Sequence, residues 1–156
     1  MSLPRRTFLK SLLATGGVMA LGTTVLPTAV MADWPKAAFE AKSIEEALMA
    51  LFESDEVTES DKITITVPEI AENGAVVPIE VSTQLPNIES MAVIAEKNPV
   101  PLIAQFNFPE PENATGWLKT RIKMNETSNV VVVAKANGKL YVARRNVKVT
   151  IGGCGG

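Results

Sequence analysis

Short runs of alternating apolar and polar residues, separated by turn residues, fill this chain from Asp61 onward, and they constrain its fold more than any other feature. Alternation with period two is typical of β-strands that have one face in a core and the other in water. Alternating runs cover 63–67, 77–82, 102–108 and 118–124, and three further strand candidates cover 90–96, 130–133 and 139–150. They do not alternate with helical segments, which argues against a parallel α/β sheet. The sequence therefore predicts a mainly β domain, an immunoglobulin-like antiparallel β-sandwich with about seven strands.

Three of these runs carry more specific predictions. Pro78 lies inside the 77–82 run, and because proline has no backbone N–H for a β-ladder, it predicts an edge strand or a bulge. Val130–Val133 is apolar on both faces, so we expect it to be buried between layers or under a partner. Asn137-Gly138 joins this run to Lys139–Thr150, and the dipeptide predicts a type I′ hairpin turn.

A short helix is predicted before the strands. Ser43 and Glu46 have the Ser-x-x-Glu spacing of a capping box, in which two backbone N–H groups at a helix start are satisfied reciprocally. Apolar residues then recur at helical spacing and form one stripe, made by Ile44, Ala47, Leu48, Leu51 and Phe52. We expect this stripe to pack against the β domain.

The first 32 residues have the layout of a cleaved export signal. Arg5 and Arg6 open a charged segment, which is followed by an apolar stretch and by a small-residue site ending at Ala32. This order is typical of a signal peptide, and the arginine pair indicates the twin-arginine (Tat) route. The apolar stretch is too short and too rich in glycine for a membrane-spanning helix. We therefore expect residues 1–32 to be a Tat signal peptide and 33–151 to be the β-sandwich domain of a periplasmic protein with no membrane anchor after processing.

Charge and composition exclude several functions. The predicted signal holds three basic residues and no acidic one, so 12 basic and 17 acidic residues remain after its removal. Such a domain has no basic patch for nucleic acid. The chain contains no histidine, the commonest general base and metal ligand, so we expect no metal site and no cofactor. Catalysis by a Cys-His pair within this chain is excluded as well.

The segment Gly152-Gly153-Cys154-Gly155-Gly156 carries the only cysteine of the sequence. Its neighbours have no side chains to pack, and glycine loses much conformational freedom on ordering, so we expect residues 152–156 to be a slim, flexible arm. A single cysteine in an exported protein indicates intermolecular pairing or a free reactive thiol. No helix N-terminus or fixed cation adjoins this thiol in the sequence, so its activation would come from the pocket that receives it. The pattern predicts a covalent substrate carrier processed by separate enzymes.

Three features together closely resemble the SoxY family, the sulfur-carrier subunits of the bacterial thiosulfate-oxidising Sox system. They are the glycine-rich pentapeptide 152–156 preceded by Val147–Ile151, the Arg5-Arg6 signal, and the stretch Ile70–Pro78. The resemblance implies that Cys154 is the covalent attachment site for the substrate. It also implies that four glycines form a swinging carrier arm, namely Gly152, Gly153, Gly155 and Gly156.

The resemblance further implies a set of partners. One is SoxZ, which lacks a signal of its own and would be exported as a heterodimer with this chain. The others are transient: the c-type cytochrome SoxAX, which couples thiosulfate oxidatively to the cysteine, the hydrolase SoxB, which releases sulfate, and a sulfane dehydrogenase or another route for the remaining sulfur.

A second interpretation stays open on the residues alone. The chain could be an exported structural or binding module linked through an intermolecular disulfide at Cys154, because an exposed thiol pairs readily in an oxidising compartment. A cysteine enzyme is the weakest alternative, since the chain offers no histidine as a base. The sequence leaves open which strands meet a partner.

Overall fold

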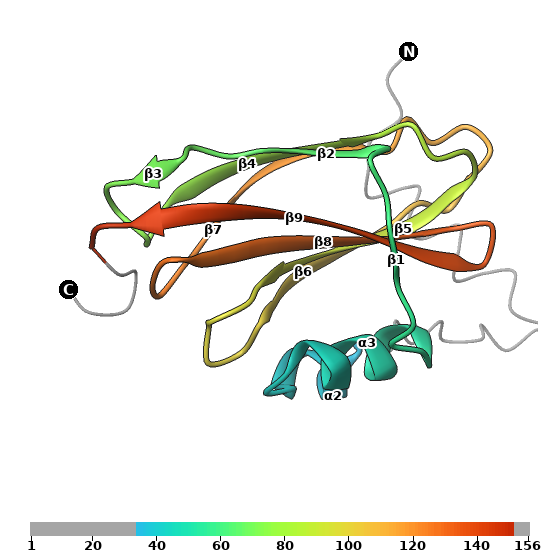
Figure 1. The fold of residues 1–156 in the computed structure, drawn as a ribbon. Helices are drawn as coiled ribbons and strands as arrows, with labels where there is room; N and C mark the ends of the chain where they lie inside the picture. Colours follow the sequence, from blue (N-terminus) through green and yellow to red (C-terminus); the bar gives the residue numbers. More distant parts are fainter. Residues whose placement is uncertain (1–33, 152–156) are drawn as a thin grey trace, which may run out of the picture. The chain divides into compact units, whose positions relative to one another are not determined.

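The computed structural model describes residues 34–151 (Figure 1). The predicted signal peptide with Arg5 and Arg6, and the glycine arm (residues 152–156) with Cys154, lie outside the described residues. The elements are α2 (Lys36–Glu40), α3 (Ile44–Phe52), β1 (Thr58–Glu59), β2 (Ile63–Thr66), β3 (Ile70–Ala71), β4 (Val77–Thr83), β5 (Ile88–Ala95), β6 (Leu102–Asn107), β7 (Trp117–Ile122), β8 (Ser128–Ala136) and β9 (Lys139–Val149).

The strands form two sheets, which confirms the predicted mainly β, immunoglobulin-like sandwich. The larger sheet has the order β1–β9–β8–β5–β6, with β3 also pairing with β9, and the smaller sheet has the order β2–β4–β7. Seven of the nine described strands have at least four residues, and each overlaps a predicted run. The other two, β1 and β3, have two residues each and pair in parallel with β9, unlike the antiparallel remainder. A two-residue strand is too short to show a period in the sequence.

The larger sheet is buried on both faces. Figure 1 shows the smaller sheet on one side of it and the helices α2 and α3 on the other. In β8, Val130 and Val132 belong to the core between the sheets, whereas Val131 and Val133 belong to the core under the helices, and none of the four is more than 1% exposed. The predicted burial of the valine run is therefore confirmed. Its second face is covered by this chain's own helices.

Helix α3 starts as the sequence predicts, with one difference. The Glu46 N–H donates to Ser43 Oγ at 3.1 Å, but the Glu46 carboxylate accepts from the N–H of Lys42, at 2.9 Å, rather than from that of Ser43. The apolar stripe packs under the larger sheet, as expected. Helix α2 was not predicted, because it has only five residues and no side-chain cap. Neither described helix is long and apolar enough to cross a membrane.

The predicted hairpin turn is confirmed by the backbone. Asn137 and Gly138 have φ values of 50° and 70°, the left-handed pair that a type I′ hairpin needs.

The prediction of an edge strand or a bulge at Pro78 is wrong, because β4 is the middle strand of the smaller sheet and pairs in regular register. The proline is tolerated because β2 ends at Thr66, opposite Glu80, so at Pro78 the strand pairs only with β7.

Candidate functional site

The described part of the candidate site is the end of β9 and the two residues after it, Thr150 and Ile151, which precede the predicted glycine arm. The sequence-predicted site residues, Cys154 with Gly152, Gly153, Gly155 and Gly156, lie outside the described residues, and Ile151 is the last residue before them. Figure 1 shows that β9 ends beside β3, at the end of the sandwich opposite the β8–β9 hairpin. This end of β9 is held by hydrogen bonds from β3 and Glu72, from the Asn73-Gly74 turn and from Thr127, and we refer to these contacts as the clamp.

Strand β3 holds one edge of β9. Ala71 pairs with Val149 in the parallel ladder, and the Thr150 N–H donates to the Ala71 carbonyl at 3.1 Å. The Thr150 hydroxyl donates to the Glu72 carbonyl at 3.0 Å. The backbone of the strand is thus hydrogen-bonded beyond its last regular residue.

The turn at Asn73 and Gly74 continues this contact to the root of the arm. The Gly74 N–H donates to the Ile151 carbonyl at 2.8 Å, and the Gly74 carbonyl accepts from the N–H of Met124 at 2.7 Å. The Asn73 side chain accepts from the Ala75 N–H at 2.8 Å, which stiffens the turn. Because Met124 follows β7 and Ile151 follows β9, one glycine ties together the ends of both sheets.

A threonine side chain holds the other edge of β9. Thr127 Oγ1 accepts from the Val149 N–H at 2.9 Å and donates to the Val149 carbonyl at 3.3 Å. This pair extends the β8–β9 ladder one step past the regular pairing of Ser128 with Val147. Each such bond contributes about 0.5–1.5 kcal/mol net. The end of β9 is therefore fixed on both edges up to Ile151, the residue before the predicted arm.

The sequence predicts the arm, which stays a prediction, but it does not predict this clamp. In the sequence, Ile70–Pro78 contributes to the family resemblance, Asn73-Gly74 predicts a turn, and Pro78 belongs to the predicted 77–82 strand. Thr127 has no predicted role, and Thr150 is only the end of the predicted 139–150 strand. No local pattern pairs residue 74 with residue 151 or residue 127 with residue 149.

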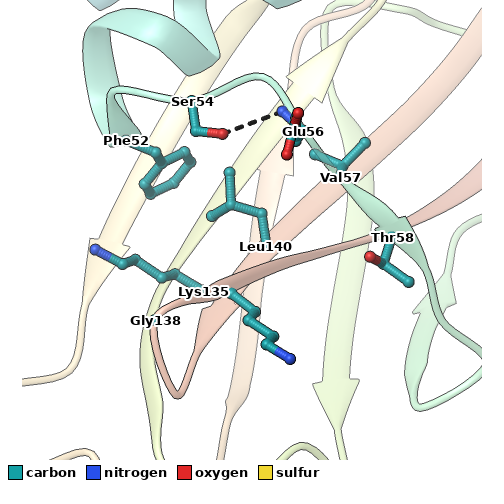
Figure 2. Close-up of a pocket in the computed structure, with 9 residues that line it drawn as sticks. Phe52, Ser54, Glu56, Val57, Thr58, Lys135, Gly138 and Leu140 are labelled. Atoms are coloured by element: carbon teal, nitrogen blue, oxygen red, sulfur yellow. Dashed lines mark hydrogen bonds between the residues drawn. The ribbon is translucent and has the colours of Figure 1, made fainter.

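A pocket of about 660 Å³ lies beside the β8–β9 hairpin, at the start of β9. Figure 2 shows Phe52 and Leu140 in its lining, with Gly138 of the β8–β9 hairpin close by and Ser54 accepting from the Glu56 N–H at 3.2 Å. Leu140 is 11 residues before Ile151, roughly 36 Å along an extended strand. Cys154 is three residues past Ile151 and reaches at most about 11 Å from it. The thiol of the same chain cannot enter this pocket.

Among the described residues, no three or more His, Cys, Asp or Glu side chains cluster so that they could hold a metal ion. The pKa of Glu80, on β4, is lowered by a hydrogen bond from the Trp117 indole and by Lys119. The indole Nε1 lies 3.1 Å from one carboxylate oxygen and the Lys119 amine 3.3 Å from the other. This group stays ionised at neutral pH and is part of the surface of the smaller sheet.

Comparisons with known proteins give two kinds of match. The family model described as "Sulfur oxidation protein SoxY" matches residues 48–154. The solved structure of the sulfur carrier protein SoxY from Chlorobium limicola f thiosulfatophilum superposes with a TM-score of 0.64 and 41% identity, covering 70% of this chain and 97% of that one. A superoxide reductase (neelaredoxin) from Ignicoccus hospitalis gives a TM-score of 0.49 and 21% identity, over 56% of this chain and 80% of that one. No curated protein matches the chain.

Proposed function

The chain belongs to the SoxY family of sulfur oxidation proteins, and from this membership we propose that it is a periplasmic carrier that holds thiosulfate-derived sulfur on Cys154. The observation that carries the proposal is the family match over residues 48–154, which extends through the whole clamp and includes the cysteine. The solved relative is itself a sulfur carrier protein. The clamped end of β9 supports the same role, because an arm that follows Ile151 would start from a firmly held residue.

In the proposed first step, the Cys154 sulfur forms an S–S bond with the sulfane sulfur of thiosulfate. The thiol proton goes to solvent. Two electrons leave one at a time through the haem of a c-type cytochrome, here SoxAX, to an external electron acceptor. The product is a cysteine S-thiosulfonate. In the next step, at SoxB, water cleaves the bond between the sulfane sulfur and the sulfonate group, which releases sulfate and one proton and leaves a cysteine persulfide with its terminal S–H. A sulfane dehydrogenase or another route would then take the remaining sulfur.

In this proposal the chain is a substrate and not a catalyst. It contains no histidine, so a base that deprotonates the thiol would be supplied by each receiving enzyme. The arm residues Gly152, Gly153, Gly155 and Gly156 would let one cysteine visit several enzymes. We also propose a heterodimer with SoxZ, with Arg5 and Arg6 directing export of the folded complex by the Tat route.

The central test compares the purified protein with its Cys154→Ser variant. Each is incubated with SoxAX, thiosulfate and an electron acceptor, and intact masses are measured. We expect the thiosulfonate adduct on the original protein only. Both proteins should melt at the same temperature, because the glycines on either side of Cys154 have no side chains to pack on it. An adduct on the serine variant would contradict the proposal. A disulfide-linked dimer without any sulfur adduct would favour the alternative of a cysteine-linked structural module.

A second test concerns the thinness of the arm. Replacing Gly153 and Gly155 with valine adds bulk on both sides of the thiol. We expect slower sulfur loading by SoxAX and an almost unchanged rate of labelling by a small maleimide. Equal losses in both rates would mean that the valines merely hide the thiol, and unchanged loading would contradict a threading arm.

A further inference from the structure

The root of the glycine arm is surrounded by apolar side chains that face solvent. Ile70, Val76 and Ile151 are 55%, 54% and 63% exposed. They are three of the six large apolar residues that are exposed in the described part of the chain; the others are Trp34, Met49 and Trp117. We refer to Ile70, Val76 and Ile151 as the apolar collar.

The hydrogen bonds of the clamp bring the collar together. Ile70 pairs with Lys148, three residues before Ile151, so it lies within roughly 10 Å of the root along the strand direction. Val76 is two residues after Gly74, whose N–H is bonded to the Ile151 carbonyl. All three residues therefore lie around the point where the arm leaves the domain.

The collar cannot easily be withdrawn into the core. In β3, Ala71 faces the core between the sheets, so its neighbour Ile70 points to the opposite side. Turning Ile70 inward would shift the strand by one residue and break its pairing with β9. Backbone pairing with β9 thus holds the Ile70 side chain on the solvent side of the strand.

The short distance in sequence between Ile151 and Cys154 limits how far from this surface a receiving protein can lie. Cys154 is three residues past Ile151, so its Cα lies at most about 11 Å from that of Ile151. A protein that takes the thiol into a recessed, water-free site must therefore bring the rim of that site close to Ile151. Any such rim would cover Ile70 and Val76 as well.

We propose that the apolar collar is the docking surface for the rim of each pocket that receives Cys154. This inference rests on the proposed function, because it takes the thiol as the group that enters. The rim should be apolar where it meets the collar. The rim should also carry a basic side chain on the side of Glu69 and Glu72, whose residues are exposed. These two residues lie beside the end of β9, because their backbone carbonyls accept from the Lys148 N–H and the Thr150 hydroxyl.

The experiment uses single serine substitutions at Ile70, Val76 and Ile151, and the triple variant. The matched controls are Met49→Ser and Trp117→Ser, which remove apolar side chains of similar exposure away from the arm. Steady-state loading of thiosulfate by purified SoxAX gives KM for the carrier, and maleimide labelling gives the intrinsic access of the thiol. All variants are measured in complex with the partner subunit.

We expect a rise in KM of about tenfold for the triple variant and a smaller rise for each single one, with kcat, maleimide rate and Tm close to those of the original protein. The controls should leave KM unchanged. Glu72→Lys should raise KM further at low salt, and the effect should shrink at high salt.

An unchanged KM in all collar variants would overturn this inference while leaving the proposed function intact, provided that Cys154→Ser still fails to load. If Cys154→Ser loads normally, the proposed function itself fails. A change in oligomeric state with unchanged KM, measured by sedimentation, would assign the collar to contacts between copies of this chain and would also overturn the inference. If the triple variant does not fold, the KM of Ile151→Ser alone tests the inference. The Ile151 side chain is mostly exposed, so this substitution should not affect folding.

Discussion

The two ends of β9 are held by different physical means. At the hairpin end, Leu140 and Val142 are buried under the helices together with Val131 and Val133. At the other end, Ile151 is mostly exposed, and hydrogen bonds from Gly74 and Thr127 fix the backbone on both edges. Burial of Leu140 and Val142 stabilises the first end, whereas beyond Val149 hydrogen bonds position the backbone and leave the Ile151 side chain exposed. A strand that must present an arm can be rigid and still leave apolar surface free for another protein.

The largest expected effect comes from placing a charge at the buried end. Val133→Asp would bury an unpaired carboxylate under the helices, and we expect a loss of stability of at least about 3 kcal/mol or failure to fold. Ile151→Asp at the exposed end should change stability by less than about 0.5 kcal/mol. Urea denaturation of both variants measures the contrast. Equal losses at the two positions would contradict the distinction between the two ends.

A smaller effect is expected from the clamp itself. Thr127→Val keeps the shape of the side chain but removes both hydrogen bonds to Val149, which should cost about 1–2 kcal/mol. Faster hydrogen exchange should appear at the Val149 amide. Thr64→Val, an exposed position on β2, is the control and should be nearly neutral. If exchange at Val149 stays slow in the Thr127 variant, the hydroxyl is not what holds this edge.

A substitution of Ser128, the residue next to Thr127, should change the stability of the protein in the opposite direction. Its side chain is buried, and its Oγ has no hydrogen-bond partner among the described residues. Ser128→Ala removes an unpaired polar group, so we expect unchanged or slightly higher stability, by up to about 1 kcal/mol. Thermal unfolding in the same buffer as the Thr127 variant makes the comparison direct. A destabilisation above that size would mean that an ordered water or another group satisfies the hydroxyl.

The smallest effect is expected at a site away from both ends of β9. The folded-state pKa of Glu80 is lowered from its ordinary value of 4.5, chiefly by the Trp117 hydrogen bond. The ionised carboxylate therefore favours the folded state at neutral pH, and this contribution is lost as the pH falls through the folded-state pKa. Trp117→Phe should move the pKa of Glu80 back toward 4.5, as measured by NMR titration of the carboxyl carbon. No upward movement would assign the shift to Lys119 instead.

Features with a local physical cause were predictable from the sequence. Period-two alternation predicted strands such as β2, β4, β6 and β7, and Asn137-Gly138 predicted its turn because both residues adopt positive φ. Ser43 predicted the start of α3. Pro78 misled the sequence prediction, because the length of β2, and not the strand order, leaves its side of β4 unpaired. The cysteine and its glycines also stood out from the sequence, and they remain a prediction, since they lie outside the described residues.

Features that depend on distant residues were decided only by the tertiary structure. The apolar character of Val130–Val133 required cover on both faces, but only the packing of α2 and α3 showed that the chain supplies this cover itself. The two-residue strands β1 and β3 have no period to detect, because they exist only through pairing with β9. The same holds for the clamp and the apolar collar: residues 74 and 127 meet the end of β9 across many residues of chain, and no local pattern encodes such a meeting. The sequence by itself determined the longer strands and the hairpin turn and predicted the arm, whereas the pairing of distant backbone groups decided how the end of β9 before that arm is held.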